Sequence, residues 1–165
     1  MCVYTGIYRT EINMFIHDIC NSLDKAKIPY AIVGGYAVAL HGALRGTIDV
    51  DIIIKWTLKN LESIEKVLNE MGLVSLLPID SNSLFHFRNE YIQNRNMIAW
   101  NFCDSKNSIN QVDIIINYDL TFADTKTINT QSGKIKVLSR KDLIAMKKAA
   151  GSPQDLEDVK ALENL

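Results

Sequence analysis

Three aspartates lie within otherwise apolar segments of the sequence. Asp49 and Asp51 belong to a stretch, residues 47–55, that alternates with a period of two, and Asp113 stands between Val112 and Ile114. This alternation predicts a β-strand whose successive side chains point to opposite faces, so Asp49 and Asp51 are expected side by side on one face. A second strand, predicted over residues 111–117, carries Asp113.

Carboxylates flanked by apolar residues call for a cation, because buried charges that lack a partner repel one another and are costly to desolvate. Oxygen donors suit a hard ion such as Mg²⁺, which proteins usually share between one or two carboxylates and substrate phosphates. We therefore predict that Asp49, Asp51 and Asp113 bind Mg²⁺. The competing interpretation of the three acids is a solvated strand face or a set of surface ion pairs.

A glycine pair upstream could supply the other half of such a site. Gly34 and Gly35 separate a short β-prone run, residues 30–33, from a segment of helical composition, residues 36–41. Backbone N–H groups at a glycine turn before a helix can approach phosphate oxygens, since no Cβ intervenes. Alone, the pattern is equally compatible with a structural turn; combined with the aspartates, it predicts a triphosphate site.

The remaining hydrophobic pattern predicts the elements that must position these residues. Residues 73–95 look less regular. Antiparallel strands are expected over residues 97–103 and 111–117, and a hairpin around Ser132 and Gly133. Helices are predicted over residues 10–25 and 58–71, and two further helices begin at the hydroxyl caps Ser139 and Ser152, each with an acid three residues later.

Composition limits the class of protein. The chain has 165 residues, 47% of them hydrophobic and 22% charged, which is enough for one core and too little for two. We expect a single domain over residues 1–165. The formal net charge of -1 excludes a global field that would attract nucleic acid. Three cysteines at unrelated spacings indicate reduced thiols and a cytoplasmic location. No segment is both apolar enough and long enough to predict a membrane span.

Three motifs resemble the signatures of the DNA polymerase beta type nucleotidyltransferase superfamily. They are the segments at residues 33–37, 45–52 and 112–114, which contain Gly34-Gly35, Asp49-Val50-Asp51 and Asp113. The pattern over residues 142–159 is similar to that of the small bacterial minimal, or abortive-infection-toxin-like, branch. The resemblance runs from about Tyr30 to the C-terminus, with a gap between residues 73 and 97.

The resemblance implies an α+β fold, a mixed β-sheet flanked by helices, and the transfer of a nucleoside monophosphate from an NTP to an acceptor hydroxyl with release of pyrophosphate. It implies that Asp49 and Asp51 ligate two Mg²⁺ ions when the NTP is bound. Asp113 would ligate one ion and help deprotonate the acceptor. Gly34 and Gly35 would hold the triphosphate.

Three further residues are candidates for nucleotide binding: Arg45, Thr47 and Lys147. For Arg45 and Lys147 the competing interpretation is a solvated surface cation. The chain departs from many relatives at Ser152, where they carry Arg, so a phosphate or partner contact at that position is in question.

The acceptor and the physiological setting stay open at this stage. A tRNA end, a partner protein's side chain and a small antibiotic are all compatible with the residues, as is a role in a toxin–antitoxin or phage-defence system. A homodimer is an open possibility. The alternative from another class is a non-catalytic, antitoxin-like or NTP-binding interaction module on the same fold.

Overall fold

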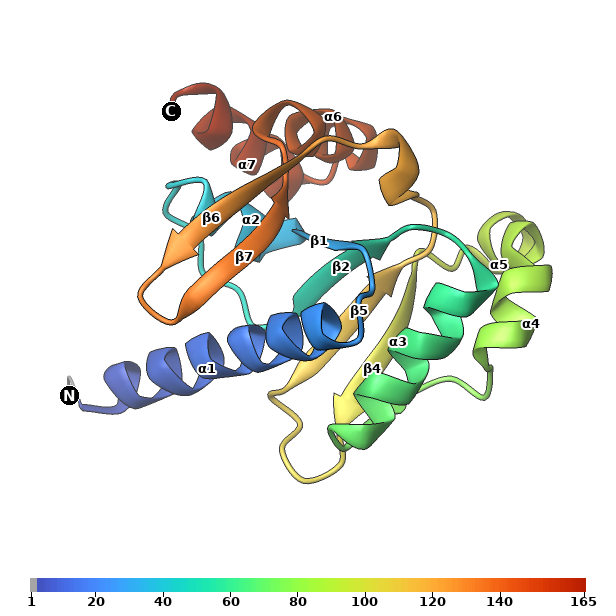
Figure 1. Cartoon of the computed structure of the whole chain (residues 1–165). Coiled ribbons are helices and arrows are strands. Elements are labelled where there is room, and N and C mark those ends of the chain that lie inside the picture. The colour runs from blue at the N-terminus through green and yellow to red at the C-terminus, as the bar shows by residue number, and fades with distance from the viewer. Residues whose placement is uncertain (1–2) are drawn as a thin grey trace.

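A mixed seven-stranded sheet forms the centre of the computed structural model, which describes residues 3–165 and the side chains from Met14 onward (Figure 1). The strands lie in the order β3-β4-β5-β2-β1-β7-β6. The α+β class and the mixed sheet flanked by helices are therefore confirmed. The strand bounds are β1 Tyr30–Val33, β2 Val50–Ile54, β3 Leu73–Ser75, β4 Ala99–Asp104, β5 Gln111–Ile115, β6 Thr125–Thr130 and β7 Gly133–Leu138.

Helices cover the sheet and close one end of it. Figure 1 shows α1 and α3 on the same face of the sheet, with α6 and α7 packed together at one end. No helix in the described part of the chain is long and apolar enough to span a bilayer. The helix bounds are α1 Val3–Lys25, α2 Gly34–Leu40, α3 Leu58–Glu70, α4 Ser81–His86, α5 Arg88–Arg95, the 3-10 turn Leu120–Phe122, α6 Arg140–Ala150 and α7 Pro153–Glu163.

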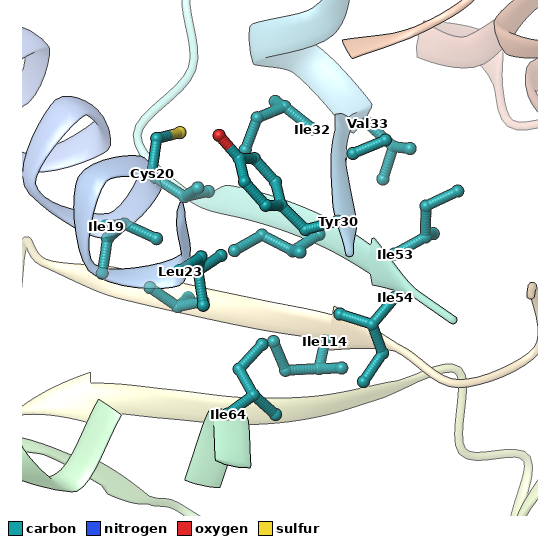
Figure 2. Packing of buried hydrophobic residues seen from close by; sticks show 14 of the residues in the cluster. Ile19, Cys20, Leu23, Tyr30, Ile32, Val33, Ile53, Ile54, Ile64 and Ile114 are labelled. Atoms are coloured by element: carbon teal, nitrogen blue, oxygen red, sulfur yellow. The ribbon is translucent and has the colours of Figure 1, made fainter. Parts of the chain in front are cut away.

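The core lies between the central strands and the helices α1 and α3. All four residues of β1 are buried, and in β2 only Asp51 is not fully buried. Figure 2 shows Ile19 and Leu23 of α1 facing these strands, with Ile64 of α3 beside Ile114 of β5. Strands buried on both faces lose their alternation of polar and apolar residues, so a carboxylate in β2 stands out against its surroundings.

The strand register places one row of residues across the sheet. Val33 of β1 is opposite Asp51 of β2, and Asp51 is opposite Asp113 of β5, which runs parallel to β2. Asn101 of the antiparallel strand β4 is opposite Asp113 on the other side. Neighbouring strands lie roughly 5 Å apart, so the two aspartates are adjacent although they are distant in sequence.

Three sequence-based predictions of local structure are wrong. The strand expected over residues 47–55 begins only at Val50, because Asp49 lies in a bend and Ile48 is 51% exposed. Gly34 and Gly35 are the first residues of α2, not a turn before it. Residues 73–95, expected to be less regular, contain β3, α4 and α5, and Asp80 caps α4 there.

The two predicted helix caps form, with one difference. Ser152 and Asp155 make a reciprocal capping box at the start of α7. Ser139 accepts a hydrogen bond from the Asp142 backbone N–H, but the Asp142 carboxylate accepts from the backbone N–H of Asp124, at 2.7 Å. Asp142 therefore ties α6 to the segment that precedes β6 instead of closing its own cap.

Candidate active site

Asp51 and Asp113 line the same cavity. They are register partners on adjacent parallel strands, and the cavity above them has a volume of about 1120 Å³. In β5 the side chains of Val112 and Ile114 are buried in the core, whereas Asp113 lies on the opposite, partly exposed face. The structure thus brings together two aspartates that are more than 60 positions apart in the sequence, as the motif resemblance predicted.

Around this pair, burial and neighbouring negative charges outweigh the positive charges nearby. Burial is the largest cause that raises the pKa of Asp51, to about 7, and the charges of Asp113 and Asp49 raise it further. Burial also raises the pKa of Asp113, and the charge of Asp49 adds to this effect. A bound divalent cation would remove both penalties, because it favours the ionised form of each carboxylate.

Asn101 orients Asp113 from the neighbouring strand. Its side-chain amide donates a hydrogen bond of 2.8 Å to Oδ1 of Asp113. This bond lowers the pKa of Asp113 and opposes the effect of burial. Within residues 14–165 no protein donor reaches the other oxygen, Oδ2, which is therefore available to an ion or a substrate proton.

The glycine pair is required by the neighbouring side chains. Gly34 has φ of +65°, and a Cβ at this position would lie 1.8 Å from Oδ2 of Asp51. A Cβ at Gly35 would lie 2.8 Å from Cβ of Thr47. Gly34 thus leaves room for the Asp51 carboxylate at the cavity wall, and Gly35 leaves room for Thr47. Gly34 lines the cavity, but neither Gly35 nor Thr47 does.

Asp49 is placed less directly than the other two aspartates. It precedes β2 and is not part of the cavity lining, although its charge acts on both Asp51 and Asp113. Among the residues whose side chains are described, no group of three or more His, Cys, Asp or Glu is close enough to hold a metal ion. The oxygen donors of Asp51 and Asp113 fit Mg²⁺; ligation by Asp49 stays a prediction.

Lys147 and Arg45, both predicted to bind the nucleotide, are held by an ion-pair cluster between α6, α7 and the loop before β2. The Lys147 ammonium lies 2.8 Å from Asp155 and 2.9 Å from Asp158, and the Arg45 Nε lies 3.1 Å from Asp158. Burial alone would lower the pKa of Lys147, but its two carboxylate partners outweigh this and raise it. Lys147 and Asp155 also line the cavity, whereas Arg45 does not. Their binding roles stay predictions.

Sequence reasoning missed two residues that shape the site. Asn101 gives no signal in sequence, because only the β4–β5 register shows that it faces Asp113. Asp158 was not predicted to take part in the site, yet its side chain is 3% exposed and it joins Lys147 to Arg45. Its position three residues after Asp155, on the same helix face, is the one signal that could have identified it.

The far end of the cavity is lined by residues outside the three motifs. This part, which we call the distal lobe, lies beyond Asn101 on the side of α5. It is mostly apolar and aromatic, with one arginine. Its residues are Leu77, Pro78, Ile79, Tyr91, Arg95, Asn96, Met97, Ile98, Ala99, Asn117 and Tyr118.

A mixed sheet whose adjacent parallel strands present two aspartates next to a glycine-led helix is the arrangement of the nucleotidyltransferase fold. The chain matches the family described as "Nucleotidyltransferase of unknown function (DUF6036)" over residues 10–163, and it belongs to that family. Among curated protein sequences, none matches the chain.

Solved structures support the assignment of the fold. A candidate nucleotidyltransferase from Thermotoga maritima (TM1012) has a TM-score of 0.62 at 17% identity, covering 94% of this chain and 94% of that chain. The lincosamide antibiotic adenylyltransferase LnuA with bound lincomycin has a TM-score of 0.61 at 16% identity, covering 91% and 95%. ANT(2")-Ia in complex with adenylyl-2"-tobramycin has a TM-score of 0.61 at 14% identity, covering 93% and 87%.

Proposed function

We propose that the protein is a Mg²⁺-dependent nucleotidyltransferase that moves a nucleoside monophosphate from an NTP to an acceptor hydroxyl. The observation that carries this proposal is the pairing of Asp51 with Asp113 at the cavity wall, where Gly34 makes room for the Asp51 carboxylate. Membership of a nucleotidyltransferase family supports the same activity.

Each residue of the pair has a defined task in this reaction. Asp51 and Asp113, joined by Asp49, would hold Mg²⁺, which supplies stabilisation of the attacking and leaving oxygens in an in-line displacement. Asp113 accepts the proton of the acceptor hydroxyl through Oδ2, while Asn101 keeps Oδ1 in place. The bond from the acceptor oxygen to the α-phosphorus forms as the bond to pyrophosphate breaks. The backbone at Gly34, which lines the cavity, would lie against the triphosphate, and Gly35 would support it through the start of α2.

Lys147 and Arg45 contribute to nucleotide binding through their charge. Both lower the pKa of Asp51, so they favour its ionised, metal-binding form. Lys147 faces the cavity with its ammonium held by Asp155 and Asp158. Thr47 packs under Gly35 and supports the start of α2.

The experiment is a measurement of NTP binding and of pyrophosphate release in Mg²⁺ and in EDTA. Wild type, Asp51→Asn and Asp113→Asn are compared, with Asp24→Asn as the matched control, because Asp24 pairs with Lys136 on the surface. We expect Mg²⁺-dependent binding in wild type and in the control, and a loss of release of about 100-fold or more in the two site variants. Absence of Mg²⁺-dependent binding in wild type, or a fully active Asp51→Asn, contradicts the proposal.

The second candidate is a non-catalytic NTP-binding or antitoxin-like module. One observation favours it: the described side chains do not assemble three carboxylates into a metal cluster. This candidate predicts a stoichiometric protein partner on purification, and no pyrophosphate release with any acceptor. Transfer of radiolabel from α-labelled NTP to any acceptor rules it out.

The acceptor and setting belong to the same proposal. LnuA and ANT(2")-Ia are bound to lincomycin and to adenylyl-2"-tobramycin in their structures, so antibiotics are one acceptor class to test. A tRNA end or a partner protein, within a toxin–antitoxin or phage-defence pair in the cytoplasm, is the other class, and it is supported by the motif resemblance alone. Incubating the protein and α-labelled NTP with each class separates them.

A further inference from the structure

The cavity is larger than one substrate requires. Its volume is about 1120 Å³, whereas pockets for a single small ligand usually measure about 300–1000 Å³. It extends across the sheet from Gly34, past Asp51 and Asp113, to Asn101 and the distal lobe. The residues of α6 and α7 that line the cavity include Lys147 and belong to the nucleotide side. With the triphosphate at Gly34 and the proton-accepting oxygen on Asp113, the distal lobe is then the part left for the acceptor.

The distal lobe has no carboxylate with which to bind a cationic acceptor. The acids that line the whole cavity are Asp51, Asp113 and Asp155. The first two are needed by the metal in the proposed reaction, and Asp155 is paired with Lys147 and Ser152. A polycationic amino sugar would therefore lose water from its ammonium groups and gain no ionic partner.

The lobe instead offers aromatic and apolar surface with one positive charge. Tyr91 and Tyr118 are partly buried, and Met97 and Ile79 lie beside them in the lining. Arg95, at the end of α5, is exposed and makes no ion pair within residues 14–165. An arginine of this kind can bind a carboxylate or a phosphate through its planar fork.

Arg88 holds the two walls of the lobe together. It begins α5, and its guanidinium donates hydrogen bonds to the carbonyls of Ile116, at 2.7 Å, and Tyr118, at 3.1 Å. The same group lies 4.0 Å from the ring centre of Trp56. Through these contacts Arg88 fixes Tyr118 relative to α5. Because its guanidinium is already occupied by them, Arg95 is the cation of the lobe that can bind a ligand.

Resting on the proposed function, we infer that the distal lobe is the acceptor site and that it selects a hydroxyl compound with a flat or apolar body and a neutral or anionic charge. Arg95 is the residue that favours the anion. Polycationic amino sugars are excluded as acceptors by the same charges.

The test uses three probes that share one ring and one hydroxymethyl group and differ in charge. They are 4-(hydroxymethyl)benzoate, 4-(hydroxymethyl)benzamide and 4-(aminomethyl)benzyl alcohol. Their affinities are measured by NMR titration of the full chain with saturating Mg²⁺ and an α,β-methylene NTP. We expect the anion to bind about two- to fivefold more tightly than the neutral amide, and the cation to bind most weakly.

Variants test whether Arg95 causes the preference for the anionic probe. Arg95→Gln should bring the anion-to-neutral ratio close to one, without changing the affinity for the neutral probe or for the NTP analogue. Tyr91→Ala should weaken all three probes. Arg140→Gln is the matched control, because Arg140 is exposed and lies outside the cavity lining, and it should preserve the order.

The outcomes separate this inference from the proposed function. Tightest binding of the cation, an unchanged ratio in Arg95→Gln, or no binding of any probe while the NTP analogue still binds would overturn the acceptor site and leave the nucleotidyltransferase proposal standing. Loss of Mg²⁺-dependent binding of the NTP analogue in wild type would overturn both.

Discussion

Two groups of aspartates, one in the cavity wall and one at its edge on α7, have opposite electrostatic environments. Asp51 and Asp113 face each other across β2 and β5 without an ion-pair partner among residues 14–165, and the pKa of each is raised. Asp155 and Asp158 lie on α7 within 3 Å of the Lys147 ammonium. Burial acts to raise the pKa of Asp155, but the hydrogen bonds from Lys147 and Ser152 outweigh it, so the pKa is lowered.

The difference separates carboxylates that are paired with cationic side chains from carboxylates that face one another, as the proposed metal site requires. A paired buried acid holds its neighbours in place, and removing it leaves a charge without a partner. An acid facing another acid costs stability, and such a cost is typical of functional sites. Three predictions can break or sharpen this comparison, and they follow in order of decreasing effect.

The largest effect is expected for Asp158→Ala. This change leaves Arg45 without its carboxylate and Lys147 with only one of two, so the free energy of unfolding should fall by about 3 kcal/mol. Urea denaturation of the variant and of wild type measures the loss. A loss below about 1 kcal/mol would show that the cluster behaves like a surface ion pair.

A gain of stability is expected for Asp51→Asn in the metal-free protein. Because the folded-state pKa of Asp51, about 7, lies above the unfolded value, ionisation favours the unfolded state as the pH rises from about 4 to about 7. One pKa unit corresponds to about 1.4 kcal/mol, and after discounting for partial exposure the variant should be more stable by on the order of 2 kcal/mol at pH 8.

The measurement for this second prediction is thermal or urea unfolding in EDTA between pH 4 and pH 8. The stability difference between Asp51→Asn and wild type should be near zero at pH 4, grow up to about pH 7 and then level off. Asp24→Asn should show no such growth. A flat difference would mean that burial and the neighbouring acids do not raise the pKa of Asp51 in the folded protein.

The smallest effect is expected for Lys148→Gln. Lys148 is the sequence neighbour of Lys147, but its partner Glu163 is 48% exposed and Lys148 itself is 56% exposed. Its removal should cost less than about 1 kcal/mol, and the cost should vanish in high salt. Differential scanning fluorimetry at low and high salt tests this prediction. A loss of stability comparable to that of Asp158→Ala would remove the contrast between the exposed pair Lys148–Glu163 and the buried pair Lys147–Asp158.

Much of the local structure could be predicted from the sequence, because it depends on neighbours along the chain. The strand carrying Asp113, the hairpin of β6 and β7 and the start of α7 follow from alternation and capping residues. The motif resemblance also predicted that Asp51 and Asp113 meet. The start of β2 was misjudged, since the alternation continues through Asp49 and Ile48 although the ladder with β5 begins only at Val50.

The sequence by itself therefore determined that a strand and a helix flank the glycine pair and which acidic residues stand in apolar segments, because periodicity and caps are local properties. The fold class followed from the resemblance of its motifs to a known family. Only the tertiary structure decided that Asn101 hydrogen-bonds Asp113 and that Asp158 joins Lys147 to Arg45, 113 residues away. Such partners are chosen by strand register and helix packing. A one-residue shift in the strand register or in the helix packing would turn the same side chains away from each other. No local sequence pattern shows which register or packing the chain adopts.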